Sequence, residues 1–506
     1  MPQSSEPTKA IRILHIGNIA NNAYLNAKIL NERGFECVVA APDYTHIMGC
    51  PEWEDADFHT LPEDQNDPDW SKIDLQGFVR PDWFVNEPLL RSLITLSGED
   101  SQSPIAIQAR RRESIRGLLR RIRDGARPIR WVVNRILKYL SRYRTVNRIK
   151  SRLFAMPGGT SATPSGNSLP AQALVPDGVE AEDVVPWNGV VGSWQAILEQ
   201  YDLVIGYGLD GLLPLICGRH PYLAFEHGTI RAFPFEDTPR GRLCAATYRE
   251  ADGVFVTNCD NRIAAERLGL KRYRFIPHPV NERLPESGGV SELRQSIQDE
   301  LQADFLVFHP SRQHWEPEVR SPNWEKGNDV LIRGFAKAAT TNSDVRFGLI
   351  MVRWGQTLDA TYQLLDELGI SDRVKWIDPL PHLRMSEMIL ACDAVADQFY
   401  LGAFGSLTPK GLMLGRPVLL KLDEDLHDWA FDEMPPVMNT ATPSEVADAL
   451  ANLTTDPRKY AAIAESSRDW YQRHHSNERI ARILIEEIEH AAGSRTIEAD
   501  QTRATS

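Results

Sequence analysis

The chain has 506 residues, which is too long for a single hydrophobic core and predicts two large domains with insertions. Hydrophobic residues make up 42% of the sequence and charged residues 25%, as in ordinary soluble globular proteins. The net charge of −13 argues against a dedicated nucleic-acid binder, so no nucleic acid is expected as a partner.

The six cysteines are scattered and form no C-x-x-C pair, a usage that favours reduced thiols over a disulfide framework or a zinc site. The N-terminus is polar, so no signal peptide is expected. No apolar run reaches the roughly 20 residues that a membrane-spanning helix needs. We therefore expect a cytoplasmic protein that does not cross a membrane.

The first elements predict a βαβ unit. Residues 11–16 form a short apolar run typical of a buried strand, and Gly17 and Asn18 turn the chain. Residues 20–33 have helical apolar spacing and are followed by a second strand at residues 37–41. This order predicts a parallel, doubly wound sheet, although Gly17 alone does not make a G-x-G-x-x-G fingerprint.

Residues 43–185 interrupt the alternation and are interpreted as an insertion, with short helices in its first half. Residues 110–152 contain 16 Lys or Arg against two acidic residues, about +14, which leaves about −27 on the remainder. Apolar spacing predicts basic amphipathic helices within residues 108–154, and a Gly/Ser/Pro-rich stretch predicts a flexible loop at residues 156–182. The basic segment fits an anionic membrane surface, a partner protein or simple solvation.

Four more apolar strands complete a first domain over residues 1–290, and alternating strands and helices resume over residues 291–475. The predicted fold class is α/β, with two doubly wound, Rossmann-like domains in tandem. Residues 476–492 form a strongly amphipathic closing helix, and residues 493–506 are expected to be a disordered tail.

Ligands of open parallel sheets bind beyond the carboxyl ends of the strands. His227 stands at such an end and can donate to a sugar hydroxyl, or it can hydrogen-bond a neighbouring loop. Arg312 and Lys326 flank another end, where two cations would neutralise a diphosphate. Gly405 and Ser406 open a helix, whose amides can face a phosphate.

In its strand-end motifs the chain resembles a GT-B glycosyltransferase, most closely the retaining family-four enzymes. "GNIANNAY", "EHGT", "KGNDVLIRGF" and "FGSLTPKGLMLGRPV" carry the resemblance, which covers nearly the whole chain outside residues 43–185. It implies two domains facing a cleft and a closing helix that returns to the first. It also implies retaining transfer of a sugar from a nucleotide diphosphate-sugar to a glycan or lipid-linked acceptor, without metal or other cofactor.

The resemblance also implies roles for single residues. Arg312 and Lys326 would hold the diphosphate and His227 would touch the donor sugar. The family's paired Glu positions are Gly402 and Lys410 here, and Asp397 or Gln398 could supply a displaced acceptor for hydroxyl groups. The remaining donor-side residues are Trp354, Phe404, Gly405 and Ser406, and the acceptor-side residues are Gly17, Asn18, Asn21, Asn22 and Thr229.

The missing acidic pair leaves a second hypothesis, a catalytically silent GT-B module that acts as a scaffold or sensor at the inner face of a membrane through residues 110–152. A third hypothesis, a GT-B-shaped epimerase, needs an acid/base pair around the sugar, and the sequence shows no clear pair.

Overall fold

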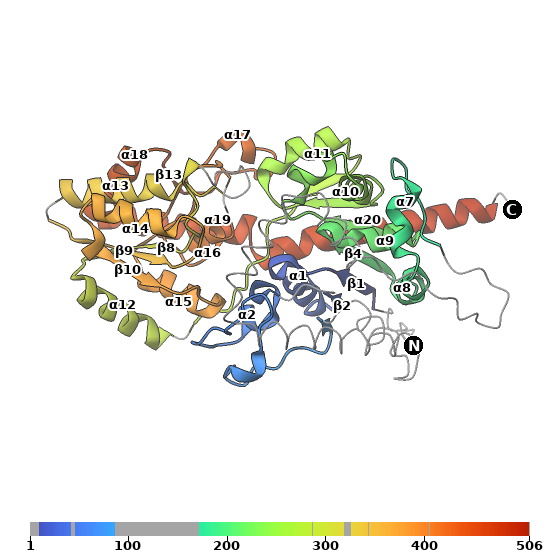
Figure 1. Cartoon of the computed structure of the whole chain (residues 1–506), viewed down its shortest axis with the longest axis horizontal. Coiled ribbons are helices and arrows are strands. Elements are labelled where there is room, and N and C mark those ends of the chain that lie inside the picture. The colour runs from blue at the N-terminus through green and yellow to red at the C-terminus, as the bar shows by residue number, and fades with distance from the viewer. Residues whose placement is uncertain are drawn as a thin grey trace, which may run out of the picture.

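The computed structural model describes residues 10–41, 46–86, 172–285, 287–317, 325–342, 344–403 and 405–504. The described elements form two α/β domains side by side, and a long helix returns along the first domain (Figure 1). The basic helices predicted within residues 108–154, most of the predicted loop 156–182 and Phe404 lie outside the described residues.

The N-terminal domain is built on seven parallel strands in the order β3-β2-β1-β4-β5-β6-β7. Strands β1 and β2 are joined by the predicted helix, and β1 pairs on its other side with β4, so Leu14 lies between Val38 and Val204. The strands are β1 (Arg12–Ile16), β2 (Glu36–Ala40), β3 (Phe84–Val85), β4 (Leu203–Tyr207), β5 (Tyr222–Phe225), β6 (Gly253–Val256) and β7 (Tyr273–Phe275).

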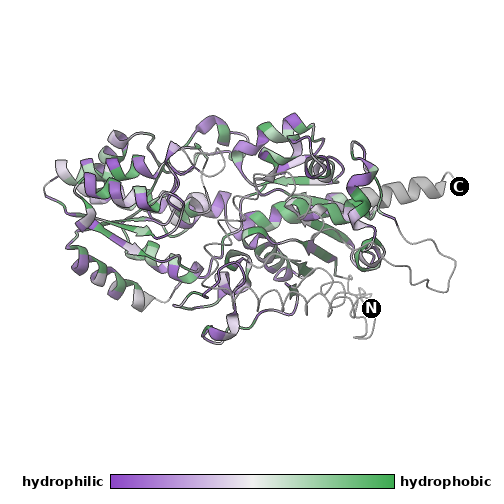
Figure 2. Ribbon diagram, in the orientation of Figure 1, coloured by the Kyte–Doolittle hydropathy of each residue, from purple (hydrophilic) through white to green (hydrophobic). Residues whose placement is uncertain are grey.

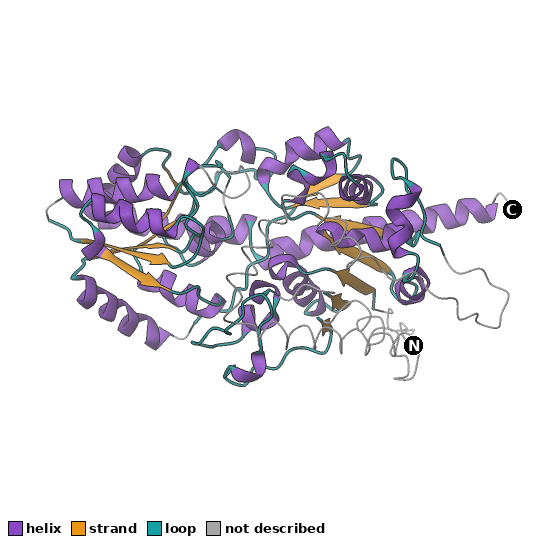
Figure 3. Cartoon of the chain, in the orientation of Figure 1, coloured by secondary structure: helices purple, strands orange, loops and turns teal. Residues whose placement is uncertain are grey.

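Helices cover both faces of this sheet (Figure 3), whose strands are hydrophobic (Figure 2). Apolar side chains of the strands form the cores beneath the helices. Helix α1 packs on one face and α8 and α9 on the other. The helices are α1 (Asn22–Asn31), α2 (Pro51–Asp55), α7 (Ala181–Val184), α8 (Val191–Leu198), α9 (Leu212–Ile216), α10 (Pro239–Arg249) and α11 (Arg262–Leu268).

The C-terminal domain repeats the design with six parallel strands in the order β10-β9-β8-β11-β12-β13. Its central strands are fully buried, since helices again lie on both faces. The strands are β8 (Phe305–His309), β9 (Phe347–Val352), β10 (Val374–Ile377), β11 (Ala394–Ala396), β12 (Val418–Leu420) and β13 (Met438–Asn439).

Nine described helices belong to this half of the chain or follow it. They are α12 (Ser287–Leu301), α13 (Asn328–Thr341), α14 (Leu358–Glu367), α15 (His382–Ala391), α16 (Leu407–Met413), α17 (Glu424–His427), α18 (Pro443–Thr455), α19 (Pro457–His474) and α20 (Asn477–Ala504). No helix among the described residues is both long and apolar enough to cross a bilayer. All six cysteines are buried, and none forms a disulfide.

Three features differ from the sequence-based expectations. Strand β3 comes from the segment interpreted as an insertion and forms the edge of the first sheet beside β2. Helix α12 begins at Ser287 and packs on α15, so the second domain starts slightly before residue 291. Helix α20 continues to Ala504, through most of the predicted disordered tail, because residues 494–504 contain no proline or glycine to end it.

Helix α20 lies along the N-terminal domain, as predicted for the closing helix (Figure 1). Its apolar side chains join the core beneath α1, and Leu484 and Ile488 are fully buried there. Arg272 of β6–β7 forms an ion pair with Glu487 of α20, with nitrogen–oxygen distances of 2.7 and 2.9 Å. The helix therefore belongs structurally to the first domain, although it follows the second in sequence.

Candidate functional site

The loops at the carboxyl ends of the two sheets approach each other. Trp429, after α17, donates from its indole nitrogen to the carbonyl of Cys259, after β6, over 2.9 Å. On the other side of the interface the imidazole of His382 lies 3.7 Å from the carboxylate of Glu54. The two domains are therefore in contact through these segments.

Lys326 is held between two of these loops. Its backbone N–H donates to His314 and its carbonyl accepts from Phe399, each over 2.8 Å. Its ammonium donates to the side-chain oxygen of Gln398 over 2.7 Å. Burial lowers the pKa of Lys326 to about 8; nearby Asp397 opposes this change.

Two guanidinium groups add to the positive charge around Lys326. Arg312 follows β8, and burial lowers its pKa. Arg231 follows β5 in the other domain, and both arginines help to lower the pKa of Lys326. Asp260 holds Arg231 in a two-pronged ion pair, at 2.6 and 2.8 Å. Three cations from two domains thus converge on one region, which favours an anionic ligand.

The loop between β11 and α16 is closed by its own carboxylate. Asp397 is 3% exposed, and its Oδ2 accepts from the Gly405 amide at 3.0 Å, the Thr408 amide at 3.3 Å and the Thr408 hydroxyl at 2.6 Å. The Gly405 amide that was predicted to face a phosphate therefore faces Asp397. Ser406 is exposed at the start of α16.

The structure explains the two positions that depart from the resembled family. Gly402 has a φ of +79°, and a Cβ there would lie 2.8 Å from the Cβ of Asp423, so a glutamate does not fit. Lys410 is half-buried on α16. Burial raises the pKa of Glu54, and the positive charge of Lys410 is the largest effect that lowers it. Glu54, only 7% exposed, thus brings a carboxyl group from the first domain close to Lys410.

His227 stands after β5, as predicted, and is half-buried. Its Nδ1 lies 3.2 Å from the amide nitrogen of Asn22, and its ring meets that of His278 edge-on. Burial and the charge of Arg231 lower the pKa of His227 to about 4. The imidazole is therefore neutral near pH 7.

The acceptor-side residues fall into two groups. Asn18, Asn21 and Thr229 are engaged within the protein: Asn18 donates to Asn21 and to the carbonyl of Gly49, Asn21 donates to the carbonyl of Cys50, and Thr229 contacts the Tyr248 hydroxyl.

Gly17 instead marks a close approach. Its φ is +89°, and any side chain there would collide with Asp210 at the end of β4. Asp210 is half-buried. On the donor side, Trp354 donates from its indole nitrogen to the carbonyl of Pro310 over 3.3 Å, which braces the loop before Arg312.

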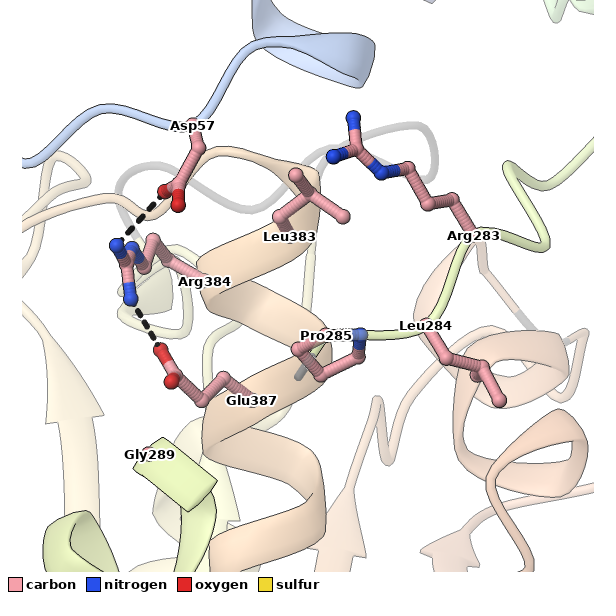
Figure 4. A pocket seen from close by; sticks show the side chains of 8 residues that line it. All are labelled: Asp57, Arg283, Leu284, Pro285, Gly289, Leu383, Arg384 and Glu387. Atoms are coloured by element: carbon pink, nitrogen blue, oxygen red, sulfur yellow. Dashed lines mark hydrogen bonds and ion pairs between the residues drawn. The ribbon is translucent and has the colours of Figure 1, made fainter. Parts of the chain in front are cut away.

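A cavity of about 270 Å³ lies between the domains near the linker, lined by Asp57, Arg283, Leu284, Pro285, Gly289, Leu383, Arg384 and Glu387 (Figure 4). Arg384 pairs with both Asp57 and Glu387 at 2.7 Å, and Arg283 donates to the carbonyl of Asp55. Because Arg384 is already paired with two carboxylates and none of the predicted site residues lines it, this cavity is not the predicted site.

Comparisons with known proteins give similarity in structure alone. No family model matches the sequence, and no curated protein matches it. Sucrose-phosphate synthase from Thermosynechococcus elongatus aligns over 96% of this chain and 100% of its own, with a TM-score of 0.50 and 13% identity. S. aureus TarM, solved with UDP, aligns over 94% and 99%, with a TM-score of 0.50 and 11% identity.

The N-terminal domain of Candida albicans trehalose-6-phosphate phosphatase aligns over 97% of this chain and 99% of its own, with a TM-score of 0.52 and 11% identity. These alignments run through both domains, and the first two neighbours are GT-B proteins. The chain has the GT-B fold. The prediction of two tandem Rossmann-like domains facing a cleft is therefore confirmed.

Within this GT-B fold, sequence reasoning did not assign roles to Arg231, Glu54 or Asp210. Arg231 and Asp210 lie in strand-end stretches, so their position was a usable signal. Glu54 lies in a segment without clear periodicity, and nothing in the sequence placed it beside Lys410. The predicted pair Arg312 and Lys326 is brought together as expected.

Proposed function

We propose that this GT-B protein is a glycosyltransferase that uses a nucleotide diphosphate-sugar. The observation that carries the proposal is the convergence of Arg312, Lys326 and Arg231 at the strand ends of both domains. A diphosphate would find a planar guanidinium fork and a compact ammonium there, and positive charge would stabilise the leaving group as negative charge develops on it. His227 would contact the transferred sugar.

The finer parts of the proposal follow from the resemblance. They are retention at the anomeric carbon, no requirement for a metal or cofactor, and a glycan or lipid-linked acceptor. Support for a nucleotide ligand comes from TarM, a fold neighbour solved with UDP. Location at the inner face of a membrane through residues 110–152 is part of the same proposal.

One observation favours a second candidate function, a catalytically silent module. Asp397 occupies the amides of Gly405 and Thr408, and so places a negative charge where the predicted phosphate cradle would be. The paired glutamates of the resembled enzymes are also absent. A protein that only scaffolds or senses at a membrane would keep the fold without needing a donor site.

Melting temperatures measured with UDP, GDP, ADP and TDP separate the two functions. One nucleotide at about 100 times its dissociation constant should stabilise the fold by about 2.7 kcal/mol, which raises the melting temperature clearly. Lys326→Met and Arg312→Ala should each abolish most of that shift. Lys337→Met and Arg333→Ala, which remove the same charges from exposed positions on α13, should leave it intact.

A nucleotide that stabilises all five proteins equally would bind elsewhere and would refute the site. If no nucleotide stabilises the unaltered protein, the silent module becomes the better account. If one does, release of sugar from its sugar conjugate, followed by mass spectrometry, tests for transfer activity.

A further inference from the structure

Asn22, the first residue of α1, lies between two histidines from distant parts of the first domain. Its amide nitrogen is 3.2 Å from Nδ1 of His227, in the loop after β5. Its amide oxygen is 3.0 Å from Nδ1 of His278, in the loop after β7. The Asn22 side chain therefore contacts both imidazole rings, and in each ring the contacting atom is Nδ1.

Two backbone carbonyls fix which way the Asn22 amide points. The amide nitrogen lies 2.9 Å from the carbonyl oxygen of Ile19 and 3.5 Å from that of Ala20. A carbonyl oxygen can only accept a hydrogen bond, so the NH₂ group must face these atoms. Turning the amide over would place its oxygen against these two carbonyl oxygens, and the two histidines would then need the opposite tautomers.

This orientation determines where the ring protons sit. The oxygen of Asn22 only accepts, so Nδ1 of His278 must carry a proton and donate to it. The NH₂ group only donates, so Nδ1 of His227 must be bare and accept from it. A neutral imidazole carries one proton, which in His227 must then be on Nε2.

We propose that Asn22 is a positioning residue that holds His227 in its Nε2–H tautomer, so that His227 offers the donor sugar a hydrogen-bond donor and not a base. The inference rests on the proposed function, because it concerns the same sugar-binding region. In this tautomer, the Nε2–H of His227 donates a hydrogen bond to an oxygen atom of the ligand, such as that of a sugar hydroxyl. Among the described residues, none accepts a hydrogen bond from Nε2 of His227, which leaves that atom for a ligand.

Neighbouring groups keep the His227 ring uncharged and hold the adjoining histidines in place. The charged group that acts on His227 is Arg231, whose positive charge opposes protonation of the ring. His278 and, behind it, His475 are the other titratable groups, and burial lowers the pKa of both. His475 Nε2 lies 2.9 Å from the backbone carbonyl oxygen of His278, so the His278 backbone is held against the residue that precedes the closing helix.

The decisive experiment is nitrogen-15 NMR of the full-length protein labelled at histidine, with His227 assigned by the signals that vanish in His227→Gln. The unaltered protein should show a bare Nδ1 and a protonated Nε2. Asn22→Asp replaces the donor NH₂ with an acceptor and should move the His227 proton to Nδ1. Asn31→Asp, at the other end of α1, is the matched control and should leave the His227 signals unchanged.

Binding measurements connect the tautomer to the ligand. Asn22→Asp should weaken UDP-glucose by about 10-fold and leave UDP nearly unaffected, since only the sugar contacts His227. A protonated Nδ1 in the unaltered protein would overturn the inference, as would an Asn22→Asp protein whose His227 still carries its proton on Nε2. If the unaltered protein binds none of UDP, GDP, ADP and TDP, the proposed function fails, and the NMR result still decides the tautomer.

Discussion

Lys326 is a half-buried ammonium group with two arginines near it and one carboxylate, Asp397, to offset them. Such a site is short of negative charge, and it would be stabilised by any anion that enters. The low pKa of Lys326 is therefore a property of the unliganded protein. A bound diphosphate would raise that pKa and keep the side chain charged.

Binding of a nucleoside diphosphate should consequently weaken as the pH rises. Lys326, with a pKa of about 8, is charged below that pH and loses its proton above it. The dissociation constant of UDP should therefore increase by up to about 5-fold between pH 8 and pH 9. Isothermal titration calorimetry across about pH 7 to 9 measures this. Lys326→Met should bind weakly with no such slope, while an unchanged slope would exclude Lys326 as its source.

The lowered pKa of Lys326 also makes the stability of the fold depend on pH, and this dependence is opposite in sign to that of nucleotide binding. The pKa of Lys326 lies below that of the unfolded chain, about 10.4. At a pH between these two pKa values, Lys326 is protonated in the unfolded chain and deprotonated in the folded protein. The contribution of Lys326 to the free energy of unfolding therefore increases with pH over this range. Stability and nucleotide affinity should thus respond to alkaline pH in opposite directions.

At the scale of single residues, the sequence predicted the strand-end positions of three candidate site residues but not the residues of the other domain that lie near them. Arg312, Lys326 and His227 were found because each follows a strand or precedes a helix, and local pattern shows that. Glu54 was missed because its position beside Lys410 depends on how α2 packs on α15. No local pattern carries such information.

At the scale of elements, α16 shows how a short helix is held by one buried carboxylate. Asp397 accepts from two amides and one hydroxyl at the start of the helix. The helix has only seven residues and contains Pro409 and Gly411, so its own propensity is low. Its stability depends largely on this cap and on packing.

Asp397→Asn should therefore destabilise the protein by about 2 kcal/mol, because an amide NH₂ would face groups that themselves donate. Urea unfolding of the full-length chain would show this as a lower midpoint. Asp425→Asn, an exposed acid at the start of α17, is the matched control and should change little. Equal midpoints for both variants would mean that Asp397 does not hold α16.

Element order was largely predictable, and the exceptions have physical causes. Strands β4 to β7 were found because they are short apolar runs ending in turns. Strand β3 was missed because it is two residues long and depends on pairing with β2 at the sheet edge. The predicted helix at residues 20–33 is a short 3₁₀ turn, Ile19–Asn21, followed by α1, because Ala20 and Asn21 have positive φ angles.

At the scale of the whole molecule, the chain crosses between domains twice, once before α12 and once after α19. The second crossing returns α20 to the N-terminal domain, where its apolar face completes the core. Two crossings tie the domains more closely than one flexible linker would.

Ile488→Ala tests how far the first domain depends on this helix. Ile488 is fully buried, and its truncation should cost about 2 to 5 kcal/mol. Glu489→Ala, exposed on the next position of α20, should be nearly neutral. Urea unfolding followed by tryptophan fluorescence gives both values. A small loss for Ile488→Ala would show that α20 only rests on the domain.

The return of α20 also reverses the usual order of events during synthesis. Domains generally fold in the order in which they leave the ribosome. Here the first domain emerges without part of its core: Ile480, Ala481, Ile483, Leu484, Ile488 and Ala491. Until α20 emerges, the sheet face on which α1 packs lacks its second helix, whereas all strands of the second domain are already made. The half of the protein that is translated first is therefore the half that finishes folding last.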